Sequence, residues 1–267
     1  MHKESAAPMF DRISEKITAR SAALQLALEN RLDRILQGWL LIAGLASAAR
    51  IATAPVPRGA EGVLPIVAPY LLLIFAPFAS TVLALRWFSN GDKEAQPSFR
   101  LAQIGRWRPV SLLEARQNPL YGTSGIMVSL MVGMMLNVPV RALEYMAAMP
   151  PIGGRVPAWL AALHFAMTFD VVMFTSLYMI AFVAALRRVP MFPRLLLAIW
   201  LGDLAMQLFT AQLVVSAGHL PHGVAVALEN LLVGNVKKVL ISMGLWLPYL
   251  LLSKRVNVTY RRRVPAH

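Results

Sequence analysis

Long apolar segments constrain this chain more than any other feature of its sequence. The segment from Val63 to Leu85 contains no Asp, Glu, Lys or Arg, and five further segments are nearly as apolar. A helix of about 20 apolar residues crosses a hydrocarbon layer about 30 Å thick. The strands of an outer-membrane barrel would alternate in polarity instead. The sequence therefore predicts an all-α fold, a polytopic transmembrane helical bundle.

We predict six membrane spans, at about residues 37–54, 63–85, 121–140, 156–186, 192–216 and 234–253. They form a membrane domain over residues 37–253, with a basic loop at 86–120 inside it and a basic tail at 254–267 after it. The composition agrees with this prediction. Hydrophobic residues make up 57% of the chain and charged residues 15%, whereas soluble domains have about half and about a quarter.

The basic residues predict how the chain is oriented. The chain has 26 Lys and Arg against 13 Asp and Glu, and most of the basic residues fall in residues 1–36, 86–120, 187–194 and 254–267. The other predicted side holds only Arg50, Arg58, Arg141, Arg155, Lys237 and Lys238. The positive-inside rule then places both termini in the cytoplasm. Because topology explains the charge, we expect anionic lipid and other membrane proteins as partners, and no nucleic acid.

The segment before the first span predicts an amphipathic helix over residues 1–36. Its apolar residues recur at steps of three, four and seven, which is typical of one helix face. This face holds Ile13, Ile17, Leu24, Leu28, Leu32, Ile35 and Trp39. The opposite face carries charges of both signs. We expect this cytoplasmic helix to lie on the membrane surface or to dock on a partner.

The basic loop at 86–120 has two informative patterns. Arg106 and Arg108 flank Trp107, an arrangement that favours contact with lipid headgroups, with a docking partner as the alternative. Ser111 is followed three residues later by Glu114, and this capping box predicts the start of a short helix.

Two carboxylic acids fall inside predicted spans. Asp170 and Asp203 each lie near the middle of a span, where a carboxylate costs about 3 kcal/mol, so both should face protein. Asp203 shares one helix face with Gln207 and Thr210. A second polar stripe, on a different side of the fourth span from Asp170, holds His164, Thr168 and Thr175. Two interpretations stay open: a proton relay or polar substrate site, and hydrogen bonds that only hold helices together.

A further charged group lies near the predicted outer ends of the spans. Glu229, Lys237 and Lys238 precede or begin the sixth span, and we expect them to line an external vestibule with Arg141 and Glu144. Glu229 and Lys237 are about 12 Å apart along a helix, too far for a direct pair. Arg141 and Glu144, at positions i and i+3, are predicted to pair with each other.

No catalytic or metal constellation is predicted. The string from Gly122 to Gly125 reproduces the GxSG motif of rhomboid intramembrane proteases, with Ser124 as the nucleophile. A nucleophilic Ser needs a His base, but only His164 falls within a span, and the string lies at the predicted cytoplasmic mouth. The chain has no Cys, and the neighbouring His219 and His222 lack a third metal ligand. No motif identifies a cofactor.

Several short strings resemble one bacterial inner-membrane family. These are Gly38-Trp39-Leu40, Phe192-Pro193-Arg194, Trp246-Leu247-Pro248-Tyr249, Ser253-Lys254-Arg255-Val256 and Thr259. Over about residues 38–54 and 156–260 the chain resembles the family catalogued as domain of unknown function 2569. That family has four helices, so the resemblance implies that spans two and three are an insertion. It implies location and fold, since the family has no assigned activity.

The leading hypothesis is a non-enzymatic accessory or assembly subunit that interacts with membrane proteins or lipids. It rests on the amphipathic segment, the basic loop and the missing catalytic constellation. The alternative is a small-solute or proton-coupled transporter that uses Asp170 and Asp203.

Overall fold

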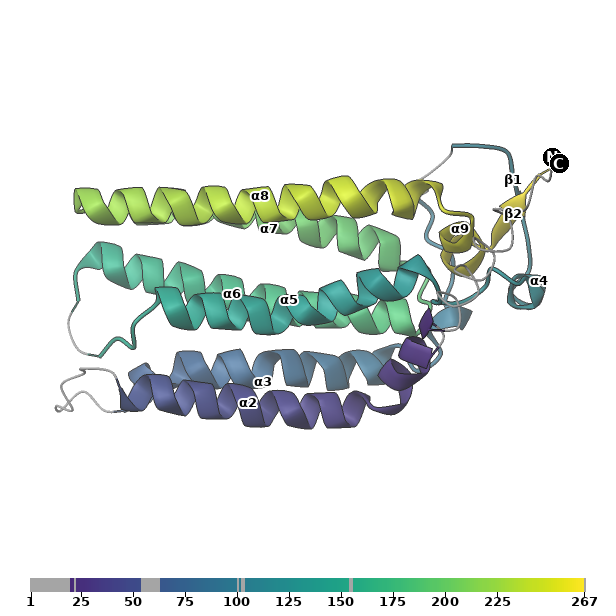
Figure 1. The fold of residues 1–267 in the computed structure, drawn as a ribbon. Helices are drawn as coiled ribbons and strands as arrows, with labels where there is room; N and C mark the ends of the chain where they lie inside the picture. The colour runs from purple at the N-terminus through teal and green to yellow at the C-terminus, as the bar shows by residue number, and fades with distance from the viewer. Residues whose placement is uncertain are drawn as a thin grey trace, which may run out of the picture.

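A bundle of long helices dominates the structure. The computed structural model describes residues 20–21, 23–53, 63–99, 101, 104–153 and 156–266. The long helices are α2 (Leu32–Ala52), α3 (Leu64–Trp87), α5 (Ile126–Ala148), α6 (Ala158–Leu186), α7 (Phe192–Ser216) and α8 (His222–Leu252). They run side by side, and each reverses the direction of the one before it (Figure 1).

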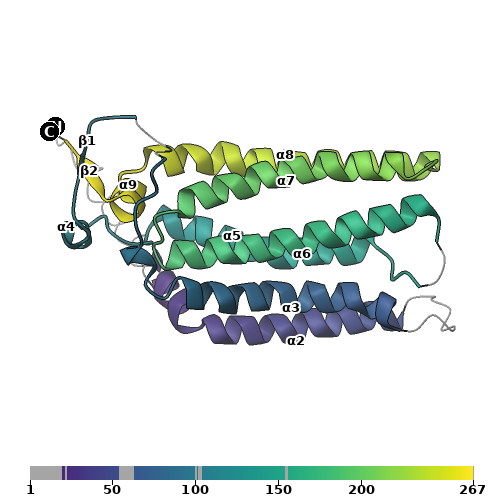
Figure 2. The ribbon, with the colours of Figure 1, turned by 180° about the vertical axis from the view of Figure 1, so that it is seen from behind.

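Five of these helices, α2, α3, α5, α6 and α7, are long and apolar enough to cross a membrane. The chain is therefore a multi-pass membrane protein by length and composition of its helices. The helix α8 is not among the five, and it carries Glu229, Lys237 and Lys238. It nevertheless lies along the bundle next to α7 (Figure 2), and whether it is a sixth span stays a prediction.

The helix α6 forms the centre of the bundle. It packs against α3, α5 and α7, and about two thirds of its apolar window is buried. Fully buried rings of Phe174, Phe182, Phe192 and Trp200 fill the contacts around it. The helices α2 and α8 lie on the outside. In α8 the buried residues are only Leu228, Val239 and Leu250.

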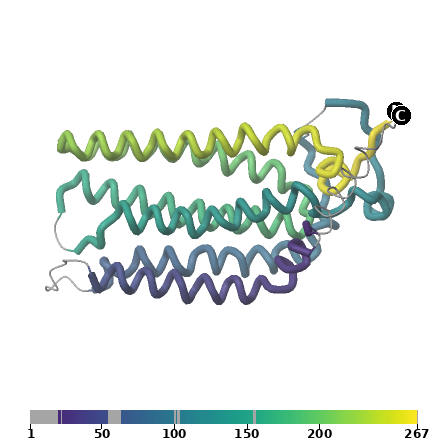
Figure 3. Tube along the Cα trace, viewed as in Figure 1, coloured from purple at the N-terminus to yellow at the C-terminus, as the bar shows by residue number. Residues whose placement is uncertain are grey.

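One end of the bundle carries a small folded cap, which we call the ribbon end. It contains the 3-10 turn η1 (Gly91–Lys93), the short helices α4 (Leu112–Gln117) and α9 (Lys254–Arg261), and the strands β1 (Trp107–Pro109) and β2 (Arg263–Pro265). The two strands pair antiparallel, with Arg108 opposite Val264. Figure 3 shows this cap gathered beyond the helix ends. The predicted loop and tail are thus joined to each other.

Local sequence signals account for part of the cap. The helix α4 begins as its capping box predicts, because the Ser111 hydroxyl accepts a hydrogen bond from the backbone N–H of Glu114 at 3.1 Å.

The helix α9 is anchored by Tyr260, whose hydroxyl donates to the carbonyl of Ala185 at 2.9 Å and whose ring lies 5.1 Å from that of Phe192.

The third long helix is displaced from its predicted range of 121–140. The helix α5 begins only after Gly122 and Gly125, which have positive φ values of 109° and 72° and thus place a turn before the helix. It then continues to Ala148. This shift brings Arg141 and Glu144 inside the helix rather than beyond its end.

The N-terminal segment needs one correction. Residues 23–30 are helical and a break at Arg31 precedes α2. Leu28, predicted to contact lipid or a partner, is buried in the main core with Leu32 and Leu36, because residues four apart share one helix face. Leu24 is 51% exposed. Ile13 and Ile17 lie outside the described residues.

Candidate functional site

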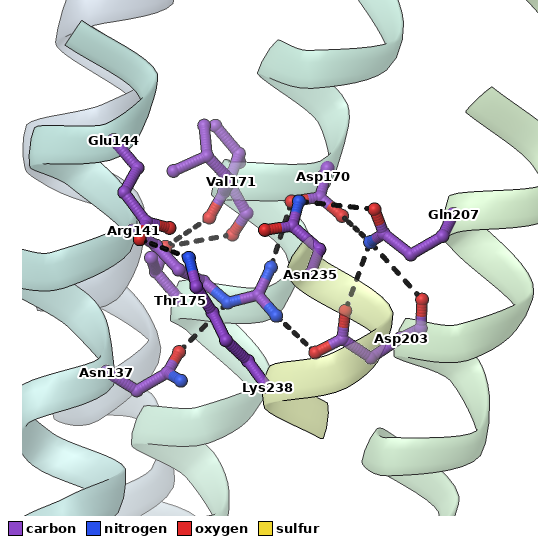
Figure 4. Close-up of polar contacts among 11 residues, drawn as sticks. Asn137, Arg141, Glu144, Asp170, Val171, Thr175, Asp203, Gln207, Asn235 and Lys238 are labelled. Carbon is purple, nitrogen blue, oxygen red and sulfur yellow. Dashed lines mark hydrogen bonds and ion pairs between the residues drawn. The ribbon is translucent and has the colours of Figure 1, made fainter. Parts of the chain in front are cut away.

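Arg141 of α5 joins two carboxylates from two other helices. Its Nη1 donates to Asp170 Oδ2 of α6 at 2.9 Å, and its Nη2 donates to Asp203 Oδ2 of α7. The Nε atom donates to Asn137 Oδ1, one turn earlier on α5, at 3.0 Å. Figure 4 shows the guanidinium lying between the two acids. One side chain thus fixes three helices to each other.

Two amides extend this network to a fourth helix. Gln207 Nε2, one turn after Asp203 on α7, lies 3.3 Å from Asp170 Oδ1 and 3.3 Å from Asp203 Oδ1. Asn235 of α8 donates to Gln207 Oε1 at 3.3 Å. We call Arg141, Asp170, Asp203, Gln207 and Asn235 the polar cluster.

Burial and aromatic rings hold the polar cluster in place. Asp203 is completely buried, and Asp170 is 8% exposed. The Arg141 guanidinium lies 5.1 Å from the ring centre of Phe174 and 5.8 Å from that of Tyr178, distances at which a cation is attracted to an aromatic face. The cluster contains two carboxyl groups for one guanidinium. When both carboxyls are ionised, it has a net negative charge in a low-dielectric setting, which is costly.

A cavity of about 630 Å³ adjoins the polar cluster. It is lined by residues of α5, α6 and α8, including Arg141, Asp170 and Asn235. Glu144 and Lys238 also line it, and they form an exposed ion pair between α5 and α8. The volume is in the range of about 300 to 1,000 Å³ that is usual for sites of small molecules.

The predicted pair of Arg141 and Glu144 needs correction. Arg141 bonds the two intramembrane acids, and Glu144 bonds Lys238. The sequence prediction ended the third span at residue 140 and so placed Arg141 outside the bilayer. The apolar pattern continues through Tyr145 and Met146, which are both buried. Extending the span over these residues would have brought Arg141 to the depth of the two acids.

Three predicted intramembrane residues make no hydrogen bond with the polar cluster in the described structure. His164 Nε2 lies 3.4 Å from the hydroxyl of Tyr145, which also bonds Thr168 at 2.8 Å. Thr210 is buried on α7, three residues beyond Gln207. Thr175, placed in one stripe with His164 by its spacing, donates to the carbonyl of Val171 on its own helix at 2.6 Å.

The remaining predicted residues are spread over the molecule. Glu229 and Lys237 are exposed on α8 and do not line the cavity, whereas Lys238 does. At the ribbon end, Arg108 pairs with Glu114 at 2.6 Å, and the carbonyl of Arg106 accepts from Ala266 at 3.0 Å. Trp107 lies in β1. Contact of these three ribbon-end residues with lipid or a partner stays a prediction.

The rhomboid-like string has a structural partner. The Ser124 hydroxyl accepts a hydrogen bond from Arg255 Nη1 at 2.8 Å, and the same nitrogen donates to the carbonyl of Leu120 at 3.2 Å. The backbone N–H of Gly122 donates to Thr259 Oγ1 at 3.0 Å. The string thus fastens the start of α5 to α9.

Comparison with known proteins adds no relative. No protein-family model, curated protein or solved structure matches the chain. The resemblance to the four-helix family therefore stays a prediction, and function has to be argued from the site.

Proposed function

We propose that this membrane protein is a proton-coupled carrier of a small polar solute and that the polar cluster is its coupling site. The observation that carries the proposal is Arg141 held between Asp170 and Asp203 beside a cavity. Ionisable groups at membrane depth commonly mark substrate pathways and proton relays.

Charge balance supports the coupling. With one guanidinium and two carboxyls, the cluster is neutral when a single proton or another monovalent cation is bound. Loss of that charge leaves a net negative site, which a low-dielectric interior disfavours. A polar solute that binds the neutral, protonated cluster more tightly than the charged one favours binding of the proton. Binding of the solute and binding of the proton then become linked events.

The position of the cavity supports a route by which a solute reaches the polar cluster. The cavity reaches Asp170 from between α5 and α8, and the Glu144–Lys238 ion pair lies on its lining. Exposed ion pairs contribute little stability, about 0 to 1 kcal/mol, so α5 and α8 can separate there at low cost. We propose that this pair opens and closes the cavity.

The competing role as an accessory or assembly subunit has less support. It rests on the amphipathic N-terminal segment, the basic loop and the missing catalytic constellation. Of the N-terminal segment, residues 1–19 lie outside the described part of the chain. A purely structural cluster also has no need of a second carboxyl, since replacing buried ion pairs by apolar groups is often neutral or stabilising.

The proposal is tested in proteoliposomes that contain a trapped pH-sensitive dye. A mixture of amino acids, polyamines and small sugars is added outside while an inward proton gradient is held. The wild-type protein should acidify the interior when the mixture is added. Asp170→Asn and Asp203→Asn should lower that rate on the order of tenfold or more, as expected when a coupling group is lost.

Glu114→Gln is the matched control. It removes an exposed carboxylate that lies at the ribbon end and is not part of the polar cluster. It should acidify the vesicles as fast as the wild type does. The proposal fails if both Asp variants keep the wild-type rate. It also fails if the wild-type protein moves no protons with any component of the mixture, a result that would favour the accessory role.

A further inference from the structure

The ribbon end contains a second cavity, of about 700 Å³, lined by four arginines. Arg194 comes from the first turn of α7, Arg261 from the last turn of α9, and Arg262 and Arg263 follow it into β2. Trp107 of β1 lines the same cavity. No Asp or Glu is among its described lining residues. We call Arg194, Arg261, Arg262 and Arg263 the arginine pocket.

Each of these guanidiniums bonds a neutral group, and in Arg263 the Nε atom donates to the amide oxygen of Asn257 at 2.7 Å. Arg261 donates to the carbonyl of Leu250 at 2.9 Å and to the amide oxygen of Asn257 at 3.0 Å. Arg262 donates to the carbonyls of Asp92 and Glu94, both at 2.7 Å. Arg194 donates to the carbonyl of Phe99. None of these contacts brings a negative charge to the pocket.

Two N–H groups in the pocket have no acceptor among the residues that the structure describes. The Nε atoms of Arg194 and Arg261 are buried and make no hydrogen bond with any described residue. A buried donor without a partner is destabilising, and more so on a charged group. Two nearby carboxylates are bound elsewhere: Asp92 accepts from Arg116 and Tyr121, and Glu114 pairs with Arg108. Glu94 contacts Arg262 through its backbone carbonyl, and its side chain is not part of the pocket lining.

The charges within the pocket also favour binding of an anion. Burial, together with the positive charges of Arg263 and Arg194, lowers the pKa of Arg261 to about 10. The pocket thus concentrates positive charge around the Arg261 guanidinium. An anion bound there would remove this repulsion and would offer acceptors to the two Nε–H groups.

We propose that the arginine pocket binds a phosphate group, carried either by a lipid headgroup or by a soluble phosphorylated compound. The planar forks of guanidinium groups match phosphate oxygens in pairs. A phosphate monoester carries a charge of about −1.5 to −2 near neutral pH, so it balances several arginines better than a carboxylate does. The cavity volume accommodates a whole headgroup or a small phosphorylated metabolite.

Both sources are compatible with the position of the pocket. The ribbon end lies beyond the ends of the candidate membrane spans (Figure 3), at the level where headgroups are found. Phe99 and Ile104, from the loop beside the pocket, are 70% and 65% exposed, as expected for side chains that dip into an interface. The proposal is independent of the transport role, because the pocket shares no residue with the polar cluster.

The test uses the full chain in an uncharged maltoside detergent and two probes measured by calorimetry. Inorganic phosphate represents the soluble source. Dihexanoyl phosphatidic acid, below its micelle concentration, represents the lipid source, and dihexanoyl phosphatidylcholine is its neutral-headgroup control. Arg194→Gln and Arg261→Gln should each weaken saturable binding on the order of tenfold, as expected for loss of a charged hydrogen-bonding partner.

Arg187→Gln is the matched control, because it removes the same charge from an exposed position at the end of α6 without touching the pocket. Binding of phosphatidic acid but not inorganic phosphate, lost only in the pocket variants, supports the proposal with a lipid source. Binding of inorganic phosphate with the same pattern supports it with a soluble source. Equal binding by wild type and pocket variants, equal loss in Arg187→Gln, or no binding of either probe overturns the proposal.

Arg261 also bonds the carbonyl of Leu250 at the end of α8, so its replacement can disturb folding. If Arg261→Gln fails to fold, Arg194→Gln alone decides, together with a measurement on the wild type. Phosphate should raise the melting temperature of the wild type above that in chloride of equal ionic strength, since a ligand that binds only the folded state stabilises it. An equal melting temperature in both salts, with no loss of phosphatidic acid binding in Arg194→Gln, overturns the proposal.

Discussion

Arg141 provides one positive charge that pairs with two buried carboxylates. Replacing Arg141 should therefore change stability differently from replacing one of the two acids. Arg141→Met leaves two acids without a counterion, and breaking a buried pair in this way costs about 3 to 5 kcal/mol. We expect a correspondingly large loss of stability in detergent.

Adding Asp203→Asn to Arg141→Met should restore part of that loss, because one of the stranded carboxylates is then gone. A double-mutant cycle on thermal unfolding measures the coupling between the two positions. Additive effects of the two substitutions would show that the guanidinium and the acid do not interact as described.

We predict that Asp92 makes the stability of the protein depend on pH in the acid range. Burial alone would raise the pKa of its carboxyl, but hydrogen bonds from Arg116 and Tyr121 and the charge of Arg116 outweigh burial and hold the pKa below its usual value of 3.8. A lowered folded-state pKa contributes stability that is complete above the unfolded value and is lost as the pH falls through the folded value. The effect should therefore appear below about pH 4 to 5.

Melting curves of the wild type and of Asp92→Asn between pH 6 and pH 3 check this expectation. The stabilising effect of the native Asp should shrink steadily over the acid part of that range. A difference between the two proteins that stays constant down to pH 3 would contradict it.

Among the elements, α9 is the clearest case of structure that its local sequence does not reveal. The tail reads as a basic, solvated segment, yet Val256, Val258 and Tyr260 are buried. The strand β2 then pairs with residues more than a hundred positions earlier. Such a short, non-local pairing has no local propensity signal, because Trp-Arg-Pro and Arg-Val-Pro are poor strand sequences.

Replacing Tyr260 tests how firmly α9 is docked. Tyr260→Phe removes only the hydrogen bond to Ala185 and should cost about 1 kcal/mol. Tyr260→Ala also removes the ring packed on Phe192 and should cost about 3 to 5 kcal/mol. Thermal unfolding of both variants gives the comparison, and equal costs would contradict the packed position of the ring.

The long helices were predictable for the opposite reason. Each of α3, α6 and α7 is a continuous apolar segment whose ends lie within a few residues of the predicted ones, since apolar length alone defines a membrane helix. The pairing of Asp170 and Asp203 with Arg141 was not predicted. The apolar length of a helix does not show which of its faces meets the next helix. The predicted third span also ends at residue 140, before Arg141, whereas α5 continues to Ala148.

At the scale of the whole molecule, the six long helices place alternate connections at opposite ends (Figure 1). If α8 crosses the membrane like the five candidate spans, its two ends lie on opposite sides. The chain has no cysteine, so single substitutions give clean labelling sites. His222→Cys should react with an impermeant maleimide from one side, and Lys254→Cys and Leu113→Cys from the other.

Labelling of intact and inverted membrane vesicles provides the measurement. Reaction of His222→Cys and Lys254→Cys from the same side would mean that α8 does not cross. Reaction of Leu113→Cys and Lys254→Cys from opposite sides would contradict the position of α4 and α9 at one end of the bundle.

Infrared difference spectroscopy can detect proton exchange at the polar cluster itself. A titration of the purified protein should reveal the C=O stretch of one protonated carboxyl that appears and disappears with pH. This band should be lost in Asp170→Asn or in Asp203→Asn and kept in Glu114→Gln. A spectrum in which the two acids never gain or lose a proton over the stable pH range would contradict the account.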